Sequence, residues 1–550
     1  MKKIIECVPN FSEGRDQAIL DQIAAAIEQV DGVKLLNVDP GKGTNRTVFT
    51  FVGDEATVVE GAFQAIKKAT ELIDMRKHSG AHPRFGATDV CPFIPITNAS
   101  MEDCIACAKK LGERVGKELA IPVYLYEYAA SAPHRKNLAN VRAGEYEGIA
   151  QKITQTDWKP DFGPTQLNEK SGNVAIGARD FLIAYNVNLN TTSTRRANAV
   201  AFDVREQGRK VKNETGEEVV QPGACKAVKG IGWFIPEYGV AQVSMNLTNI
   251  RETPVHIAFD ECVKSAFNRG MRVTGSELIG LIPLKSILEA GRYFLTKQQR
   301  STGVSESELI HIAIKSMGLD ELNPFDPQKR IIEYMLNDTD AAPLVSMNLR
   351  QFADETASES PAPGGGSIAA YIGALGISLG TMVANLSSHK KGWDERWAAF
   401  SDYAETGQKI KDELLKLVDE DTHAFNKIMD AFGLPKSSDT EKAVRKEAIQ
   451  SATKNAIEVP LKVMQLSLQS FEVIKAMAEI GNPNSVSDAG VGALCARSAV
   501  YGAWLNVKIN ASGYEDKAYV QQVLAQGETM LNEAIVKEKD VLKLVETKIG

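Results

Sequence analysis

A loop rich in glycine and proline carries two of the seven histidines in this chain. Residues 77–89, KHSGAHPRFGATD, place His78 and His82 four positions apart. On a helix this spacing would put both imidazoles on one face, where they could bind a metal. However, Gly80 weakens a helix, and Pro83 disfavours helical backbone at the residue before it. The sequence therefore predicts a loop, in which His82 is a candidate acid and base near neutral pH. A turn histidine bonded to the backbone is the alternative.

Two further side chains in glycine-containing loops suit a substrate that bears carboxylates. Arg84 follows the histidines, and its planar guanidinium can bind both oxygens of one carboxylate. Asp39 stands in VDPGKGTNR, residues 38–46, at the end of an expected strand. There it could orient a base or accept a hydrogen bond from a substrate amine, and the two glycines would let backbone amides approach a ligand. Turns also need glycine, so a plain connecting turn is the alternative.

A long polar segment, residues 161–182, separates two similar patterns of strands and helices. It reads DFGPTQLNEKSGNVAIGARDFL and contains several glycines and a proline. Loops of this length inside compact domains are often functional. A simple linker between subdomains is the alternative interpretation.

Further along, SESPAPGGGS leads into a helix made of small residues. The glycines Gly364, Gly365 and Gly366 precede Ser367 at the expected helix start, where free N–H groups attract anions. The GK[ST] of a phosphate-binding loop is missing, so we reject an ATP site. Close helix–helix packing is the other use of such small residues.

A run of acidic residues, DEDTHAF, lies inside a strongly apolar helical pattern. It contains Asp419, Asp421 and His423. On a helix, positions 419 and 423 share a face and 421 points elsewhere. A carboxylate held inside a helical bundle would have a raised pKa and could act as an acid at neutral pH. A solvated charged face is the alternative.

Composition narrows the class of protein. The chain has 550 residues and a net charge of −7, which argues against a general nucleic-acid binder. Seven scattered cysteines indicate reduced thiols and an intracellular location, and the Cys104–Cys107 pair falls in a helical pattern without a second pair. The first residues contain too short an apolar run for a signal peptide, and no 18-residue apolar run predicts a membrane span.

The order of expected elements indicates two fold classes on one chain. The pattern β-α-β-β-α occurs twice in the first half, which predicts two α+β subdomains related to ferredoxin-like sandwiches, with a cleft between them. After a linker the sequence shows helical periodicity, and we expect five to nine helices there. The expected divisions are residues 1–178 and 179–334 for the subdomains, 335–343 for the linker and 344–550 for an all-α domain.

Several short motifs, in order, resemble one family. They are ECVPNFSEGRD, HSGAHPRFGATDVCPF, KPDFGPT, REQGR, GIGWF, QKRIIEYML, APGGGS, DEDTHAF and NVKIN. Together they resemble the bifunctional formimidoyltransferase-cyclodeaminases. The resemblance implies a transferase and lyase of histidine degradation. The first half would transfer a formimidoyl group between N-formimidoyl-L-glutamate and tetrahydrofolate. The second would cyclise 5-formimidoyltetrahydrofolate to 5,10-methenyltetrahydrofolate and release ammonia.

The resemblance also implies site residues. His82 would be the transferase acid and base, with Asp39 orienting charge, and Asp421 would be the cyclodeaminase carboxylate, with Asp419 as its rival. The implied folate-binding segment consists of Gly163, Pro164, Thr165, Gln166, Leu167, Asn168, Glu169, Lys170, Ser171 and Gly172. Glu169 and Lys170 make this segment more polar than the family pattern. Residues 211–230 are also more polar than that pattern and are expected to lengthen a surface loop.

The implied co-substrate is tetrahydrofolate, polyglutamylated, with no metal or nucleotide required. We expect a cytoplasmic homo-oligomer that binds small folates and N-formimidoyl-L-glutamate, and neither nucleic acid nor membranes. Two alternatives stay open. The helical half could serve only as an oligomerisation module beside a working transferase, or the whole chain could bind folate without catalysis.

Overall fold

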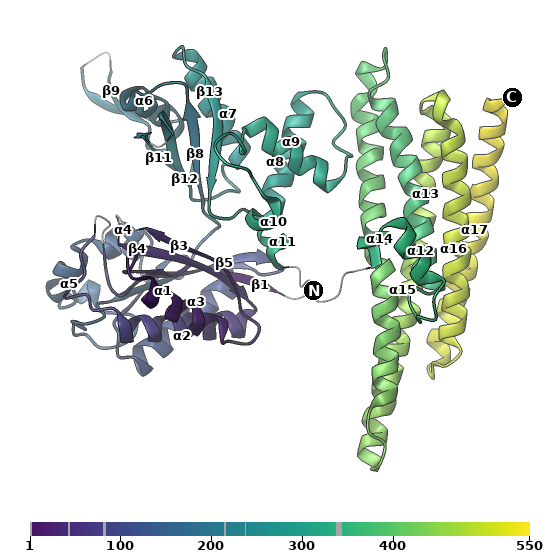
Figure 1. The fold of residues 1–550 in the computed structure, drawn as a ribbon, viewed down its shortest axis with the longest axis horizontal. Helices are drawn as coiled ribbons and strands as arrows, with labels where there is room; N and C mark the ends of the chain where they lie inside the picture. The colour runs from purple at the N-terminus through teal and green to yellow at the C-terminus, as the bar shows by residue number, and fades with distance from the viewer. Residues whose placement is uncertain (1–2, 42–44, 81–83, 214–215, 237, 337–343) are drawn as a thin grey trace. The chain divides into compact units, whose positions relative to one another are not determined.

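The computed structural model describes residues 3–41, 45–80, 84–213, 216–236, 238–336 and 344–550. The chain forms two compact units. The α/β unit comprises residues 1–290 and 314–337, and the helical unit comprises residues 291–313 and 338–550. Every strand of the described residues belongs to the α/β unit (Figure 1). The expected succession of an α/β region and an all-helical region is therefore confirmed.

The first sheet of the α/β unit has seven strands. Their order is β1-β4-β2-β5-β7-β6, with β3 paired to the outer side of β4. Strand β7 runs parallel to β5 and β6, and the other pairings are antiparallel. The strands are β1 (Ile4–Cys7), β2 (Asn10–Phe11), β3 (Lys34–Gly41), β4 (Arg46–Gly53), β5 (Thr88–Thr97), β6 (Val123–Glu127) and β7 (Val174–Ala178).

Three amphipathic helices cover one face of this sheet (Figure 1). They are α1 (Gln17–Glu28), α2 (Glu55–Leu72) and α3 (Met101–Glu118), and their N-caps are Asp16, Asp54 and Ser100. Because side chains alternate along a strand, each strand sends every second residue into this core. Ile5 and Cys7 are buried there. On the opposite face, α4 (Leu138–Arg142) and α5 (Glu145–Lys152) cover the part beside β6 and β7.

The second sheet is antiparallel, in the order β11-β12-β8-β13. Helices α6 and α7 pack on one face of it. The expected β-α-β-β-α pattern is present, and one further strand follows it. The elements are β8 (Ile183–Leu189), α6 (Thr194–Val204), β11 (Val228–Ile235), β12 (Val240–Leu247), α7 (Val255–Asn268) and β13 (Val273–Ile279).

The segment after α6 contains a two-stranded hairpin. Strands β9 (Arg209–Lys212) and β10 (Glu218–Gln221) pair with each other, and all residues of β10 are exposed. The segment thus forms strands of its own, and its greater length than in the family stays a prediction. Further helices follow the second sheet: α8 (Leu284–Lys297), α9 (Glu306–Met317), α10 (Pro327–Arg330) and α11 (Ile332–Leu336).

The helical unit is a bundle of long helices around one apolar core (Figure 1). The described part of residues 344–550 contains six α-helices and no strand, as expected. They are α12 (Leu349–Thr356), α13 (Gly365–Ser388), α14 (Trp397–Gly433), α15 (Asp439–Ile480), α16 (Val486–Ala511) and α17 (Lys517–Ile549). Helix α13 contacts α14, α15 and α16.

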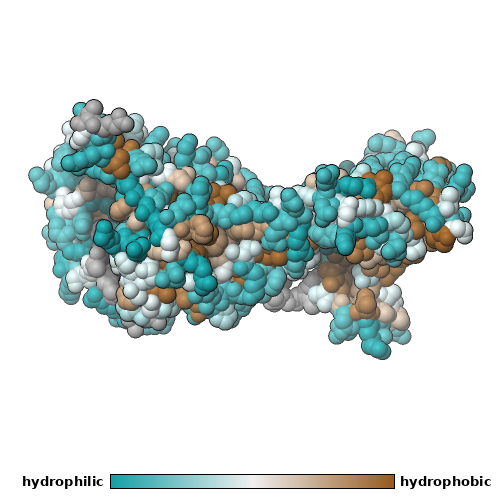
Figure 2. Space-filling view, turned by 90° about the horizontal axis from the view of Figure 1, so that it is seen from above, coloured by the Kyte–Doolittle hydropathy of each residue, from teal (hydrophilic) through white to brown (hydrophobic). Residues whose placement is uncertain are grey.

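Helix α13 is the one described helix that is long and apolar enough to cross a membrane. Its mean hydropathy over the best 18-residue window is 1.6, and 61% of that window is buried inside the unit. A bundle's central helix passes the same test, so this is weak evidence for a membrane span. In Figure 2 the visible surface of both units is mainly hydrophilic, with scattered apolar patches.

Candidate active sites

A cavity of about 730 Å³ lies between the two sheets of the α/β unit, as the repeated pattern predicts. Its walls come from the sheet faces that point away from the covering helices. Asn10 and Thr50 line it from the first sheet, and Ala184 and Asn246 line it from the second. Residues 184 and 246 are direct partners across β8 and β12, so they project on the same side. Both faces carry polar as well as apolar side chains, which suits a ligand with both kinds of group.

Glu6 stands on the cavity wall because of strand alternation. Its neighbours Ile5 and Cys7 enter the helix-covered core, whereas Glu6 points to the other side with Val8 and Asn10. The side chain is only 3% exposed, and burial raises the pKa of its carboxyl to about 7. A carboxyl with this pKa is partly protonated at neutral pH.

A cluster of two arginines and one aspartate forms part of the same wall. Arg46 and Arg142 both line the cavity, and both donate to Oδ2 of Asp89, which is fully buried. Arg46 also donates through Nε to Oδ1 of Asn10 at 3.1 Å. Two positive charges share one negative charge, so the cluster keeps a net positive charge. This arrangement fits a ligand carboxylate.

Two residues that the sequence predicted for this site, Asp39 and Arg84, lie in different surroundings. Asp39 lies on β3 opposite Val48, and both residues line the cavity. Arg84 instead pairs with Glu147 and lies over the ring of Tyr146, 5.6 Å from its centroid, outside the cavity lining. His82 lies outside the described residues.

The other histidine of that loop matches the structural alternative. Nε2 of His78 donates to the carbonyl oxygen of Asn45 at 2.9 Å, and burial lowers the pKa of the imidazole. The side-chain amide of Asn45 in turn donates to the carbonyl of Ser79 at 2.9 Å. His78 thus fastens this loop to the end of β4.

Residues 163–172, the implied folate segment, are all described, and none of them lines the cavity. Gly163 has a φ of +84°, and a side chain there would collide with the Ile121 carbonyl. At the other end, the backbone N–H of Ala87 donates to the Ser171 carbonyl at 2.7 Å. The segment therefore packs against residues 85–87, in the second half of the histidine loop. Its role in folate binding stays a prediction.

In the helical unit, Asp421 meets the N-terminus of α13. Its Oδ2 accepts a hydrogen bond from Oγ of Ser367 at 3.1 Å, and that hydroxyl also donates to the Val418 carbonyl at 2.9 Å. Burial raises the pKa of the Asp421 carboxyl, although hydrogen bonds from Ser367 oppose the shift. Gly366 makes this approach possible, since a Cβ there would lie 2.6 Å from Oδ2. A half-buried acid thus sits on the glycine-rich helix start.

Asp419 has a different environment, although it is only two residues away. Its Oδ1 accepts the backbone N–H of Leu344 at 2.6 Å. Burial raises the pKa of this carboxyl as well, and the bond from Leu344 and the nearby His423 oppose the shift. Asp419 therefore anchors the short 3₁₀ turn Leu344–Ser346, whereas Asp421 faces the start of α13.

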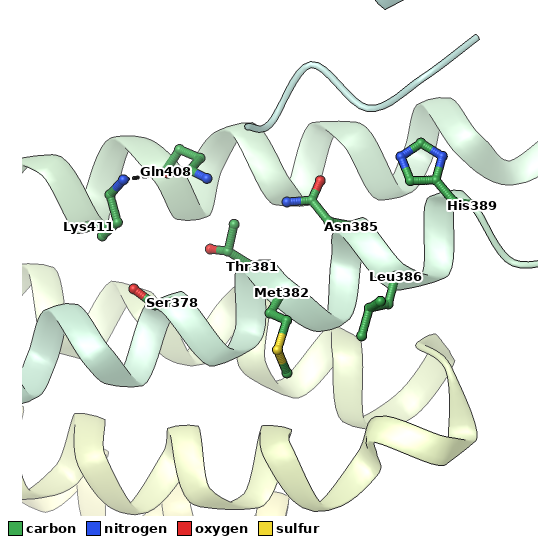
Figure 3. A pocket seen from close by; sticks show the side chains of 8 residues that line it. All are labelled: Ser378, Thr381, Met382, Asn385, Leu386, His389, Gln408 and Lys411. Atoms are coloured by element: carbon green, nitrogen blue, oxygen red, sulfur yellow. Dashed lines mark hydrogen bonds between the residues drawn. The ribbon is translucent and has the colours of Figure 1, made fainter. Parts of the chain in front are cut away.

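A second cavity, of about 370 Å³, opens between α13 and α14 (Figure 3). Lys411 donates to Gln408 at 2.6 Å, and Asn385 and Gln408 both donate to the Gly303 carbonyl. These polar groups hold the segment around residue 303. The lining of this cavity begins at Ser378, about 17 Å from Ser367 along the α13 axis at 1.5 Å per residue, so the cavity is separate from the Asp421 site. Within the described residues, no cluster of three or more His, Cys, Asp or Glu side chains could hold a metal.

Comparison with known proteins agrees with this two-unit organisation. Models of the N-terminal subdomain and of the rest of the formiminotransferase domain match residues 4–179 and 184–337, and the model called formiminotransferase-cyclodeaminase matches residues 348–529. A formimidoyltransferase-cyclodeaminase from Dictyostelium discoideum is 43% identical over 547 residues, which are 99% of either chain. The chain belongs to the formimidoyltransferase-cyclodeaminase family.

Each half also resembles a separate enzyme. A glutamate formimidoyltransferase from Streptococcus pyogenes is 42% identical over 295 residues, covering 54% of this chain and 94% of the relative. A methenyltetrahydrofolate cyclohydrolase from Methylorubrum extorquens is 37% identical over 202 residues, covering 37% of this chain and 97% of the relative. The α/β unit and the helical unit of this family member thus have relatives that exist alone.

Sequence reasoning named Asp39 but missed Glu6, Arg46 and Arg142 of the cavity wall. Glu6 lies in a motif used for the family resemblance, and apolar residues flank it on both sides. A polar residue inside an otherwise apolar strand was the available signal. Arg46 and Arg142 left no such signal, because an arginine in a turn or a short helix is ordinarily exposed.

Proposed function

We propose that this chain carries both activities of its family. The α/β unit transfers the formimidoyl group between N-formimidoyl-L-glutamate and tetrahydrofolate. The helical unit cyclises 5-formimidoyltetrahydrofolate to 5,10-methenyltetrahydrofolate and releases ammonia. The observation that carries this proposal is that relatives of each half exist as separate enzymes, while the full chain is 43% identical to a bifunctional one.

In the transfer step, N5 of tetrahydrofolate attacks the formimidoyl carbon, and the bond from that carbon to the glutamate nitrogen breaks. N5 loses a proton and the leaving nitrogen gains one. One imidazole can perform both transfers in turn, and His82 is our assignment for it. The net positive charge of Arg46, Asp89 and Arg142 suits a carboxylate of the glutamate substrate. Asp39, on the same wall, would orient the charge that develops on the imidazole.

In the cyclisation step, N10 attacks the formimidoyl carbon and the bond to the terminal nitrogen breaks. N10 gives up a proton, and the departing nitrogen needs one to leave as ammonia. Burial raises the pKa of Asp421, which favours its protonated, proton-donating form, and its place beside Ser367 gives it a fixed orientation. The reaction is internal to the substrate, so positioning supplies much of the rate. We assign Asp421, rather than Asp419, to this role because Asp419 is engaged by Leu344.

Several finer assignments belong to the same proposal. Residues 163–172 would contribute to folate binding from beside the histidine loop, and the folate would be polyglutamylated. The second subdomain would be classed with ferredoxin-like folds, which its β-α-β-β-α-β order and its strand order support. The enzyme would act in the cytoplasm, in histidine degradation.

Homo-oligomer formation has a candidate surface on the helical unit. Helix α13 contains no charged residue, and it packs beside α16. The two helices together expose Leu375, Met382, Leu386, Val491, Leu494, Tyr501, Leu505 and Ile509. An apolar helix face of this extent is typical of a protein interface, and a second copy of the same face would cover it symmetrically.

Two variants of the full chain test the assignment of the two reactions. Release of L-glutamate from N-formimidoyl-L-glutamate and formation of 5,10-methenyltetrahydrofolate are measured separately. His82→Ala should lower the first by about 10²–10⁴-fold and leave cyclisation of supplied 5-formimidoyltetrahydrofolate intact. Asp421→Asn should do the reverse. Wild-type protein that performs transfer but no cyclisation would favour a helical half that serves only assembly, and absence of both would favour a binding protein.

A further inference from the structure

Glu6 is a buried acidic side chain of the cavity wall that the proposed mechanism does not use. It is a carboxyl that is 3% exposed, at the centre of a strand, and it borders the cavity. None of the described residues hydrogen-bonds to this carboxyl. Its nearest electrostatic neighbours are Arg179, whose charge favours the ionised form, and Glu333, whose charge opposes it. A buried carboxyl without a bonded partner is costly unless a ligand completes it.

The substrate of the proposed transfer carries a group of complementary shape and charge. A formimidoyl group on nitrogen is an amidine, which is a strong base and is therefore cationic at neutral pH. Its two N–H groups point in parallel, like those of an arginine side chain, and a carboxylate accepts such a pair with both oxygens. The rest of the substrate is anionic, and the Arg46–Asp89–Arg142 cluster on the same wall is positive.

We infer that Glu6 is a specificity-determining residue, which binds the formimidoyl cation of N-formimidoyl-L-glutamate through its two carboxylate oxygens. This inference rests on the proposed transferase function. Pairing with Glu6 selects the amidine over a neutral amide of the same size, while the arginine cluster selects the glutamate end. In the empty cavity, burial keeps the pKa of Glu6 near 7, and an arriving cation favours the ionised form.

Two ligands separate this role from a structural one. N-formimidoyl-L-glutamate is cationic at its head, and N-formyl-L-glutamate has the same shape but an uncharged head. Their dissociation constants are measured by calorimetry on the full chain, for wild type and Glu6→Gln. We expect wild type to prefer the cation. Glu6→Gln should bind the cation at least about thirtyfold more weakly, the equivalent of about 2 kcal/mol for one lost partner of a buried charge pair, and should bind the amide unchanged.

Glu118→Gln serves as the matched control, because Glu118 pairs with Arg114 on α3, in the helix layer on the other side of the sheet. It should leave both dissociation constants as they are. Glu6→Asp keeps the charge on a shorter side chain and should restore part of the preference. The inference is overturned if wild type binds the two ligands equally, a result that needs no variant to fold. It is also overturned if Glu6→Gln weakens both ligands by the same factor.

Failure of the proposed transferase function would give a different experimental result. If wild type releases no L-glutamate from N-formimidoyl-L-glutamate in the presence of tetrahydrofolate, the transferase assignment falls, and the Glu6 role falls with it. If wild type is active and yet does not discriminate between the cation and the amide, only the Glu6 role falls.

Discussion

The close approach of Asp421 to Gly366 leads to a sharp prediction for Gly366→Ala. A Cβ at position 366 would lie 2.5 Å from Cγ and 2.6 Å from Oδ2 of Asp421, where ordinary contact begins at 3.4 Å. Oδ1 of Asp421 would lie nearer still, so the carboxylate must move by at least about 0.9 Å, the difference between 3.4 and 2.5 Å at Cγ. The carboxylate would then lose the hydrogen bond that Ser367 donates to it. A displacement of this size in a reacting group lowers a rate by about 10²-fold, or about 2.7 kcal/mol of activation free energy.

The same substitution should leave stability nearly unchanged. Alanine is favoured over glycine within a helix by about 0.5–1 kcal/mol, and position 366 is the second residue of α13. The colliding atoms belong to the end of a side chain, which can rotate away at little cost. The loss of the Ser367 hydrogen bond, about 1 kcal/mol, roughly offsets the gain in helix propensity.

The assay compares formation of 5,10-methenyltetrahydrofolate from supplied 5-formimidoyltetrahydrofolate with release of L-glutamate in the transferase reaction. Cyclisation should fall about 10²-fold while transfer and the melting temperature stay near the wild-type values. Gly433→Ala at the end of α14, where a Cβ meets nothing within 4 Å, is the control. Normal cyclisation by Gly366→Ala would refute the reasoning, because it would show that the position of the Asp421 carboxylate does not matter.

Four other changes have expected outcomes. Burial raises the pKa of Glu6 from 4.5 to about 7, so the protonated carboxyl stabilises the fold fully below pH 4.5. Up to about 3 kcal/mol of the free energy of unfolding is lost as pH rises through 7. The free energy of unfolding in urea should therefore differ less between pH 5 and pH 8 for Glu6→Gln than for wild type. Arg142→Met should raise KM for N-formimidoyl-L-glutamate by about 10–100-fold and leave KM for tetrahydrofolate nearly unchanged, and a rise in both would contradict a role in binding the glutamate end. Leu505→Glu, at a position 48% exposed on α16, should lower the molar mass measured by light scattering; an unchanged mass would reject this interface. Asp419→Asn should reduce cyclisation by less than tenfold, since this residue holds Leu344 and does not face α13; a loss equal to that of Asp421→Asn would reverse the assignment.

The arrangement of elements followed largely from local patterns. The short strand-like run KIIECVP and the helical spacing in DQAILDQIAAAIEQV correspond to β1 and α1. The repeated β-α-β-β-α order and the helical second half could also be predicted, because strand and helix periods are properties of contiguous residues. The parallel pairing of β7 with β5 and β6 could not be predicted, since it depends on which distant segments meet.

The candidate sites, like the fold, could be predicted from the sequence only in part. Sequence motifs indicated the histidine loop, Asp39 and the acidic run, and they suggested a carboxylate-binding role for Arg84. The structure pairs Arg84 with Glu147 and places Arg46 and Arg142 on the cavity wall, and we propose that role for these two arginines instead. A guanidinium can pair with whatever acid the fold brings near it, and Glu147 is 63 positions from Arg84. Only the folded chain shows such a pairing.

The sequence by itself determined that two fold classes share one chain, and which short segments carry reactive groups, because periodicity and motif order are written along the chain. The motif register favoured Asp421 over Asp419 without showing the surroundings of either, and it gave Glu6 no role. The tertiary structure decided what surrounds each of these carboxyl groups. Two residues on a helix differ by about 200° in direction, so packing of α13 against α14 determines which carboxylate meets Ser367. Likewise, helices on one face of the first sheet leave Glu6 facing the cavity on the other.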